Sequence, residues 1–100
     1  MMLSDMFAQL EAARLLTWKV AWSADHYEYG DPKLSAMAKV FSAEVAVKIA
    51  IHAVEIHGSY GGTRDFPVER YVRDAVHLLA ASGTEQIHRL RTARFLDEDW

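Results

Sequence analysis

The sequence contains no cysteine, and this absence removes several kinds of site. Without thiols the chain forms no disulfide bond, offers no thiol nucleophile and provides no cysteine ligand for a metal ion. The absence is typical of a reducing compartment, and Asp5 stands where a signal peptide would carry a positive charge. We therefore expect a cytoplasmic protein. No apolar run approaches the roughly 18 residues of a membrane span, so we expect no membrane partner.

The chain is also short of positive charge, with 11 Lys and Arg residues against 14 Asp and Glu residues and a net charge of −3. A general nucleic-acid binder presents a basic face, so we expect no nucleic-acid partner. Apolar residues, in contrast, make up 51% of the 100 residues. A small domain buries a smaller share of its surface than a large one does, so part of this apolar material is expected to stay exposed. We predict a partner surface, which a second copy or another subunit would cover.

Proline and glycine are scarce, with two and five residues, and they divide the chain into helical segments. Apolar residues recur at spacings of three and four over residues 3–27, which predicts a long helix. Asp31 is placed to accept bonds from the first free amides of a second helix, and Pro32 suits the first position of that helix. The second helix is predicted over residues 33–57. Gly58 is expected to end it in a left-handed conformation.

The second predicted helix is apolar over most of its circumference, which is typical of the central helix of a bundle. Its polar residues are expected to form one narrow stripe: Ser35, Lys39, Ser42, Glu44, Lys48, His52 and Glu55. On the first helix Trp18 and Trp22 are four residues apart and therefore share one side, where we expect them to lie in a core or an interface.

A loop at residues 58–66 follows the second helix and holds three glycines. Pro67 fits the first turn of a short third helix that runs to about Leu79. Within that helix Glu69 and Arg73 are four residues apart, so we expect them to form an ion pair.

The last helix is predicted from a capping box, in which Ser82 and Glu85 have the required spacing. It begins at Gly83 or Thr84 and runs to about Leu96, beyond which the acidic tail is expected to fray. Together the segments predict one all-α domain over the whole chain, a four-helix, up-down bundle-like fold. Its two long helices are antiparallel, and one short and one medium helix follow.

Signals for chemistry are weak when the residues are taken alone. The glycine spacing of the 58–66 loop fits neither a dinucleotide-binding nor a phosphate-binding fingerprint, and the flanking elements are helices. Such a loop is also expected where packing alone requires unusual backbone angles. Among the five histidines, His52 and His57 form only a suggestive group with Glu55, so we expect no metal site.

Four short motifs carry a resemblance when they are taken together. They comprise Glu55, Gly58 and Ser59; Phe66, Pro67, Val68, Glu69 and Arg70; Arg73, Asp74 and Ala75; and Ser82, Gly83 and Thr84. In this order and spacing, the motifs resemble those of the C-terminal helical domain of the acyl-CoA dehydrogenase family of flavoenzymes. The resemblance covers nearly the whole chain.

The resemblance implies a function in the FAD-dependent α,β-oxidation of an acyl-CoA thioester. In that family the domain packs its helices into the core of a tetramer, and the glycine loop contacts the adenine-dinucleotide half of FAD in a neighbouring subunit. The positions that correspond to FAD contacts are Glu55, Gly58, Ser59, Thr84, Glu85 and Gln86, and the position near the acyl-CoA thioester is Gly83.

The sequence departs from the family pattern at the position of the usual catalytic base. Many members place a glutamate directly before the Gly-Thr pair, whereas this chain has Ser82. A serine hydroxyl is a poor base near neutral pH unless a partner activates it, so we expect no catalytic residue in this chain. Glu55 and Ser59 replace the glutamine and the glycine of the family loop.

Two hypotheses about function therefore stay open. In the first, the chain is the C-terminal domain or a small subunit of an acyl-CoA dehydrogenase-like flavoenzyme, inactive as an isolated chain, and it meets FAD and acyl-CoA only in a complete assembly. That assembly is a homo-oligomer or includes a partner flavoprotein subunit. In the second, the chain is a non-catalytic helical module for protein interaction or oligomerisation that derives from the same family.

Overall fold

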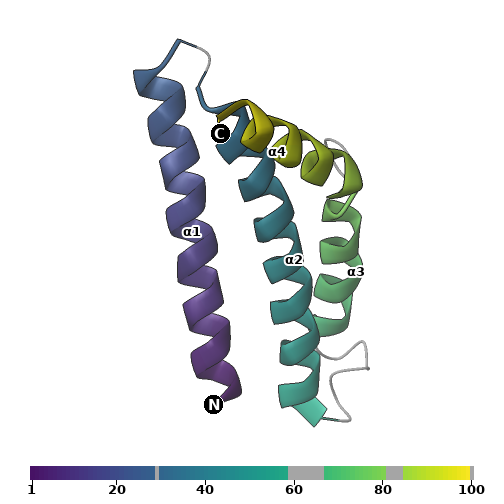
Figure 1. Cartoon of the computed structure of the whole chain (residues 1–100). Coiled ribbons are helices and arrows are strands. Elements are labelled where there is room, and N and C mark those ends of the chain that lie inside the picture. The colour runs from purple at the N-terminus through teal and green to yellow at the C-terminus, as the bar shows by residue number, and fades with distance from the viewer. Residues whose placement is uncertain (29, 59–66, 81–84, 100) are drawn as a thin grey trace.

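Four helices form the regular structure of the chain, shown in Figure 1 as a computed structural model that describes residues 1–28, 30–58, 67–80 and 85–99. They are α1 (Met2–His26), α2 (Pro32–His57), α3 (Val68–Leu78) and α4 (Glu85–Asp99). The described residues contain no strand. The predicted all-α fold, with two long helices followed by a short one and a medium one, is confirmed.

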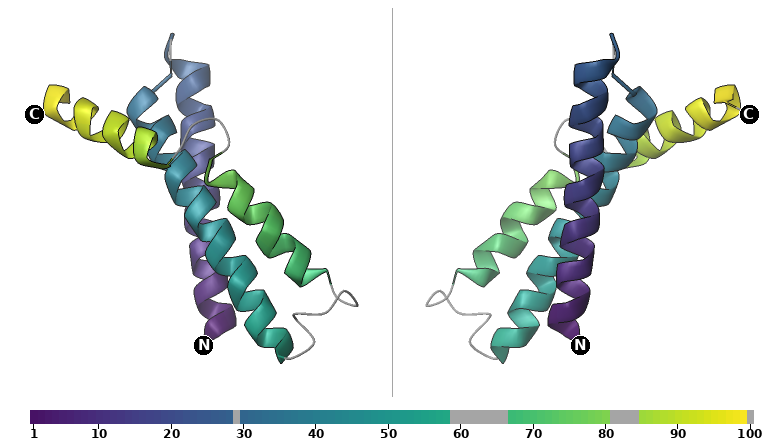
Figure 2. Two further views of the ribbon diagram at one scale, coloured as in Figure 1. Left: turned by 90° about the vertical axis from the view of Figure 1, so that its right-hand side faces the viewer. Right: turned by 90° about the vertical axis from the view of Figure 1, so that its left-hand side faces the viewer.

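Helix α2 lies at the centre of the fold, as its apolar circumference predicted. Each of the other three helices packs against α2, and within the described residues no Cα atoms of α1, α3 and α4 come within 8 Å of one another. Helices α1, α2 and α3 alternate in direction, so α1 and α3 run the same way (Figure 1). Helix α4 crosses α2 and projects away from the other three helices (Figure 2). The molecule is consequently elongated, with extents of 49 × 24 × 23 Å.

The start of α2 is fixed by the residues that the sequence indicated. The Asp31 side chain accepts a hydrogen bond of 3.2 Å from the backbone N–H of Leu34. Pro32 occupies the first turn, where its missing N–H costs no hydrogen bond. Gly30 precedes this cap with a φ of 66°, a value that residues with a side chain rarely adopt. The predicted cap and the antiparallel reversal between α1 and α2 are confirmed.

Each long helix ends with a histidine whose ring bonds to its own last turn. The Nδ1 atom of His26 donates to the carbonyl of Trp22, and that of His57 donates to the carbonyl of Ala53, both at 2.8 Å. The His26 ring also stacks on Trp22, with ring centroids 4.1 Å apart. Trp22 and Trp18 are 51% and 61% exposed, so in this chain they belong to the surface and not to the core.

Gly58 ends α2 with a positive φ of 61°, as predicted, but its ψ is −137°. A left-handed helical residue has ψ near +47°, so the predicted left-handed conformation is wrong in ψ. Glycine tolerates both conformations, which is why the residue type indicates the sign of φ but leaves ψ open. The amide of Gly58 donates to the carbonyl of Glu55 and closes the last turn of the helix.

Helix α3 is held to α2 by packing and by one long side chain. Val68 and Ala75 are buried, and the Lys39 Nζ atom of α2 donates to the carbonyl of Leu78 at the end of α3. The predicted ion pair is confirmed, since Arg73 Nε lies 3.0 Å from Glu69 Oε1.

Helix α4 is longer than predicted. It reaches Asp99 and therefore includes the tail beyond Leu96 that was expected to fray. Residues 85–99 contain neither glycine nor proline, so nothing in the sequence ends the helix earlier. Ser82 lies outside the described residues, and its capping box with Glu85 stays a prediction.

The core is made mainly of small side chains. The buried apolar residues are Ala13, Leu34, Ala36, Ala38, Val40, Ala43, Val45, Ala50, Val68 and Ala75. Large apolar side chains lie mostly outside this core, and Phe7 and Leu90 are 65% and 71% exposed. The expected exposed apolar faces are thus present. Within the described part of the chain, no helix combines the length and the apolar character that a membrane span requires.

Candidate functional site

The first group of predicted FAD-contacting residues lies at the C-terminal end of α2. Glu55 is exposed in the last turn, and Gly58 follows the helix with its amide engaged by the Glu55 carbonyl. The ring of His57 is turned back onto α2 through its bond to Ala53. Ser59 lies outside the described residues, so its predicted role is not tested.

The second group lies at the N-terminal end of α4. Glu85 is the first residue of that helix, and the side chain of Gln86 is exposed in the first turn. Thr84, Gly83 and Ser82 fall outside the described residues, which leaves their predicted roles untested.

The structure keeps the two groups apart within one chain. The end of α2 precedes α3 and the start of α4 follows it, so the groups lie at opposite ends of α3 (Figure 1). Helix α3 has 11 residues. At a rise of 1.5 Å per residue, such a helix is roughly 16 Å long. One copy of the chain therefore contacts a single ligand with both groups only if that ligand is extended.

The two groups also offer opposite chemistry to a ligand. At the end of α2 the described groups are the Glu55 carboxylate and backbone carbonyl oxygens, and the helix dipole is negative there. These acceptors suit ligand hydroxyl or amino groups and repel phosphate. At the start of α4 the first amides lack carbonyl partners within the helix and the dipole is positive, which suits an anionic group. The two helix ends therefore differ in the sign of their helix dipole.

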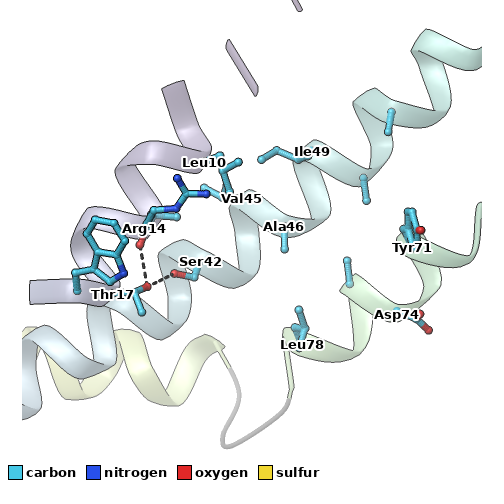
Figure 3. Close-up of a pocket in the computed structure, with 15 residues that line it drawn as sticks. Leu10, Arg14, Thr17, Ser42, Val45, Ala46, Ile49, Tyr71, Asp74 and Leu78 are labelled. Atoms are coloured by element: carbon cyan, nitrogen blue, oxygen red, sulfur yellow. Dashed lines mark hydrogen bonds between the residues drawn. The ribbon is translucent and has the colours of Figure 1, made fainter. Parts of the chain in front are cut away.

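A groove of about 700 Å³ lies between α1 and α3, with α2 as its floor (Figure 3). Small and branched apolar side chains of α2 form the floor, among them Val45, Ala46, Ile49 and Ala50. Leu10 and Trp18 form part of the α1 wall, and Tyr71 and Leu78 form part of the α3 wall. The surface of this groove is largely apolar and is open to solvent along its length.

The polar side chains among the described lining residues come from all three helices. The Thr17 hydroxyl donates to a carbonyl of its own helix at 2.8 Å and lies 3.5 Å from the hydroxyl of Ser42 (Figure 3). Arg14 is paired with Glu11 at 2.5 Å on the α1 wall. Asp74 is exposed on the α3 wall, and none of the described lining residues is a histidine.

Metal ligation finds no support in the described residues. No three His, Asp or Glu side chains of that part of the chain gather closely enough to hold an ion. His52 lines a small hollow beside Leu79, whereas the His57 ring is bonded to its own helix.

Comparison with known proteins decides the family. The family described as "Acyl-CoA dehydrogenase, C-terminal domain" matches residues 1–96. This chain belongs to the acyl-CoA dehydrogenase family. It is 46% identical over 92 residues to the 3-sulfinopropanoyl-CoA desulfinase of Paraburkholderia xenovorans, which covers 92% of this chain and 23% of that protein.

A second relative and one solved structure agree with this assignment. The chain is 43% identical over 98 residues to the probable acyl-CoA dehydrogenase FadE25 of Mycobacterium tuberculosis, covering 95% of this chain and 24% of that protein. A chain in the structure of the electron transferring flavoprotein of Acidaminococcus fermentans superposes with a TM-score of 0.90 at 39% identity. That match covers 95% of this chain and 25% of the other. The chain thus spans about a quarter of the length of the proteins that it resembles.

The sequence signals did not indicate the groove between α1 and α3. The alanines Ala46 and Ala50 are small enough to allow close helix approach, but which helices approach them depends on tertiary packing. In this acyl-CoA dehydrogenase C-terminal domain, the groove between α1 and α3 therefore leaves apolar surface exposed to solvent.

Proposed function

We propose that this chain acts as the C-terminal helical domain of an FAD-dependent, acyl-CoA dehydrogenase-like assembly and has no turnover by itself. The family match over residues 1–96 carries this proposal, because it assigns the domain and covers almost all of the chain. The exposed apolar side chains support it further, since they need a partner surface. The relatives are about four times as long as this chain, so most of a complete enzyme would come from further polypeptide.

In this proposal the two ends of α3 meet different parts of FAD. Glu55 accepts hydrogen bonds from a ribose or adenine group, beside Gly58 and Ser59. Glu85 and Gln86, together with Thr84, meet the nucleotide from the start of α4. Since the two groups lie at opposite ends of α3, two copies or subunits would share the flavins between them.

Gly83 is assigned to the neighbourhood of the acyl-CoA thioester, and Ser82 to the position of the family base. Bound FAD would supply the acceptor for the hydride that leaves the acyl chain. The residues of this chain would position the nucleotide and shield it from water. Ser82 cannot take the α-proton efficiently without an activating partner, which is why we assign no catalytic residue here.

Restoration of a truncated relative tests the proposal. FadE25 without its matched domain would be mixed with this chain, and flavin retention would be followed by visible absorbance after gel filtration. We expect co-elution with flavin, and a weaker flavin signal with Gln86→Ala and Glu55→Ala. Acyl-CoA-dependent dye reduction is expected only when Ser82→Glu is introduced. Absence of co-elution with the truncated enzyme would contradict the proposed function.

The alternative is a non-catalytic helical interaction module, and Ser82 in place of the base is the observation that favours it. The same experiment separates the two functions. A module would co-elute with the truncated relative without increasing its retained flavin, and Ser82→Glu would then restore no turnover. Turnover by the wild-type mixture would instead rule out a purely structural role.

A further inference from the structure

The backbone carbonyl of Leu78, at the C-terminal end of α3, is bound by a side chain of another helix. The Nζ atom of Lys39 on α2 donates a hydrogen bond to it. The last carbonyls of a helix lack amide partners within that helix, and a cation there also meets the negative end of the helix dipole. The carbonyls of Val76 and His77 accept backbone amides that follow the helix. Lys39 therefore completes the end of α3 from outside that helix.

Lys39 lies where three helices meet. It lines a small hollow together with Thr17 and Val20 of α1 and Leu78 of α3. Its side chain is partly buried, and a lysine in such a place packs its aliphatic stem while its ammonium group reaches the edge. Fewer conformations are then open to it than to a lysine in water. The hydrogen bond to α3 consequently costs less side-chain entropy than a bond from a fully exposed lysine would.

A second side chain of α2 holds the other side of the connection between α3 and α4. Arg89 of α4 pairs with Glu44, which lies five residues after Lys39 on α2. This spacing corresponds to a rise of roughly 7.5 Å along the helix. Residues 79–84 could span up to about 21 Å, so a connection of that length restricts the start of α4 only loosely. The two contacts restrict it more, because both flanks are attached to one short stretch of α2.

The crossing of α4 over α2 explains why both attachments matter for the first turn of α4. Helix α4 projects away from the other three helices (Figure 2). It meets α2 around Arg89 and Thr92, and His88 is buried beside this crossing. Glu85 and Gln86 precede the crossing, and a helix held only there is free to turn about it. The end of α3, which Lys39 holds, limits that rotation.

We propose that Lys39 is a positioning residue: by holding the end of α3, it sets the place of the first turn of α4 and with it Glu85 and Gln86. The inference rests on the proposed function, in which these two residues meet the nucleotide. It deepens that function by naming a residue of α2 that acts through the end of α3. Since the contact lies within one chain, its effect on the position of Gln86 is present without FAD.

Distance measurements on the full chain test this inference directly. Because the chain has no cysteine, Ser35→Cys and Gln86→Cys introduce the only two thiols, both at exposed positions, one on α2 and one on α4. Nitroxide labels and double electron–electron resonance would give the distribution of distances between them. Lys39→Met keeps most of the stem and removes the donor, so it should shift or broaden this distribution. An unchanged distribution would overturn the proposal.

Further variants separate the hydrogen bond from general effects of substitution. Lys39→Arg keeps a cationic donor and should retain the wild-type distribution. Lys48→Met removes an exposed lysine of the same helix that lies beside Leu79, and it should also leave the distribution unchanged. Circular dichroism would verify folding, and Lys39→Gln would replace Lys39→Met if the latter lost helix content. Equal changes for the substitutions at positions 39 and 48 would contradict the assigned role.

Flavin retention then separates positioning from stability. In the mixture with truncated FadE25, Lys39→Met should co-elute like the wild type but retain about threefold to tenfold less flavin per complex. Lys39→Arg should recover this loss. Lower thermal stability with unchanged flavin retention would make Lys39 a merely structural residue and overturn the proposal. If the wild type did not co-elute, the proposed function would fail, and the distance measurement would still decide whether Lys39 places Gln86.

Discussion

Arg89 of α4 and Glu44 of α2, which are 45 positions apart in the sequence, form an ion pair that joins the crossing helix to the central one. Both side chains are about half exposed, so water screens much of their attraction. The pair therefore fixes where α4 lies along α2 more than it stabilises the fold.

The coupling between Arg89 and Glu44 is expected to be small. A double-mutant cycle with Arg89→Ala and Glu44→Ala should give a coupling free energy of about 0.2–1 kcal/mol. Urea unfolding followed by circular dichroism would measure it. Arg91→Ala, on the exposed side of the same helix, is the control and should change the free energy of unfolding by less than about 0.5 kcal/mol. A coupling of several kcal/mol would show that the pair is much better shielded than its exposure indicates.

The cap of α2 is expected to contribute measurably to stability. Asp31→Ala removes the acceptor of the Leu34 amide and should lower the free energy of unfolding by about 0.5–2 kcal/mol. Asp31→Ser keeps an acceptor at the same position and should retain most of this stability. Thermal unfolding of the three proteins would compare them. Equal losses for alanine and serine would mean that the cap bond contributes little.

Gly58 is expected to tolerate no side chain, although space is available. A Cβ atom at this position would meet nothing within 4 Å, so the cost of Gly58→Ala comes from the backbone angles alone. We expect a loss of about 1–3 kcal/mol in the free energy of unfolding. Gly30→Ala is the comparison, since its φ is also positive and its Cβ would lie 3.5 Å from Ala24 Cα. An unchanged unfolding midpoint for Gly58→Ala would contradict the assigned conformation.

Trp18 has a larger side chain than Leu34, but we expect its truncation to lower the free energy of unfolding by less. Trp18 is 61% exposed and Leu34 is 9% exposed. Trp18→Ala should therefore cost less than about 1 kcal/mol, whereas Leu34→Ala should cost about 2 kcal/mol or more. Denaturant unfolding would rank the two variants. A larger loss for Trp18→Ala would show that the indole is covered in solution, and sedimentation at several concentrations would then identify self-association as the cause.

Local signals in the sequence were sufficient for the elements and for most of their ends. The spacing of apolar residues, the Asp31 cap and the positive φ of Gly58 depend on contacts within a few residues, and each of these predictions is confirmed. The end of α4 was missed, because an acidic tail was taken as a reason for fraying although no helix-breaking residue is present.

Relations between distant segments could not be predicted in the same way. The polar residues of α2 were expected to form one narrow stripe, yet three of them contact three different helices. Ser42 approaches Thr17 of α1, Lys39 reaches the end of α3, and Glu44 pairs with α4. Their spacing gives the direction of each side chain but not the identity of the helix that meets it. The candidate FAD residues share this limit, and their roles stay predictions.

The arrangement of three helices around α2 affects how the fold tolerates substitutions. Since the Cα atoms of α1, α3 and α4 come within 8 Å of α2 but, within the described residues, not of one another, substitutions on well-separated positions of different outer helices should act almost additively. Outer helices can then diverge independently of one another, whereas each change on α2 must satisfy several neighbours at once. Evolutionary variation in this domain is therefore expected to concentrate away from α2.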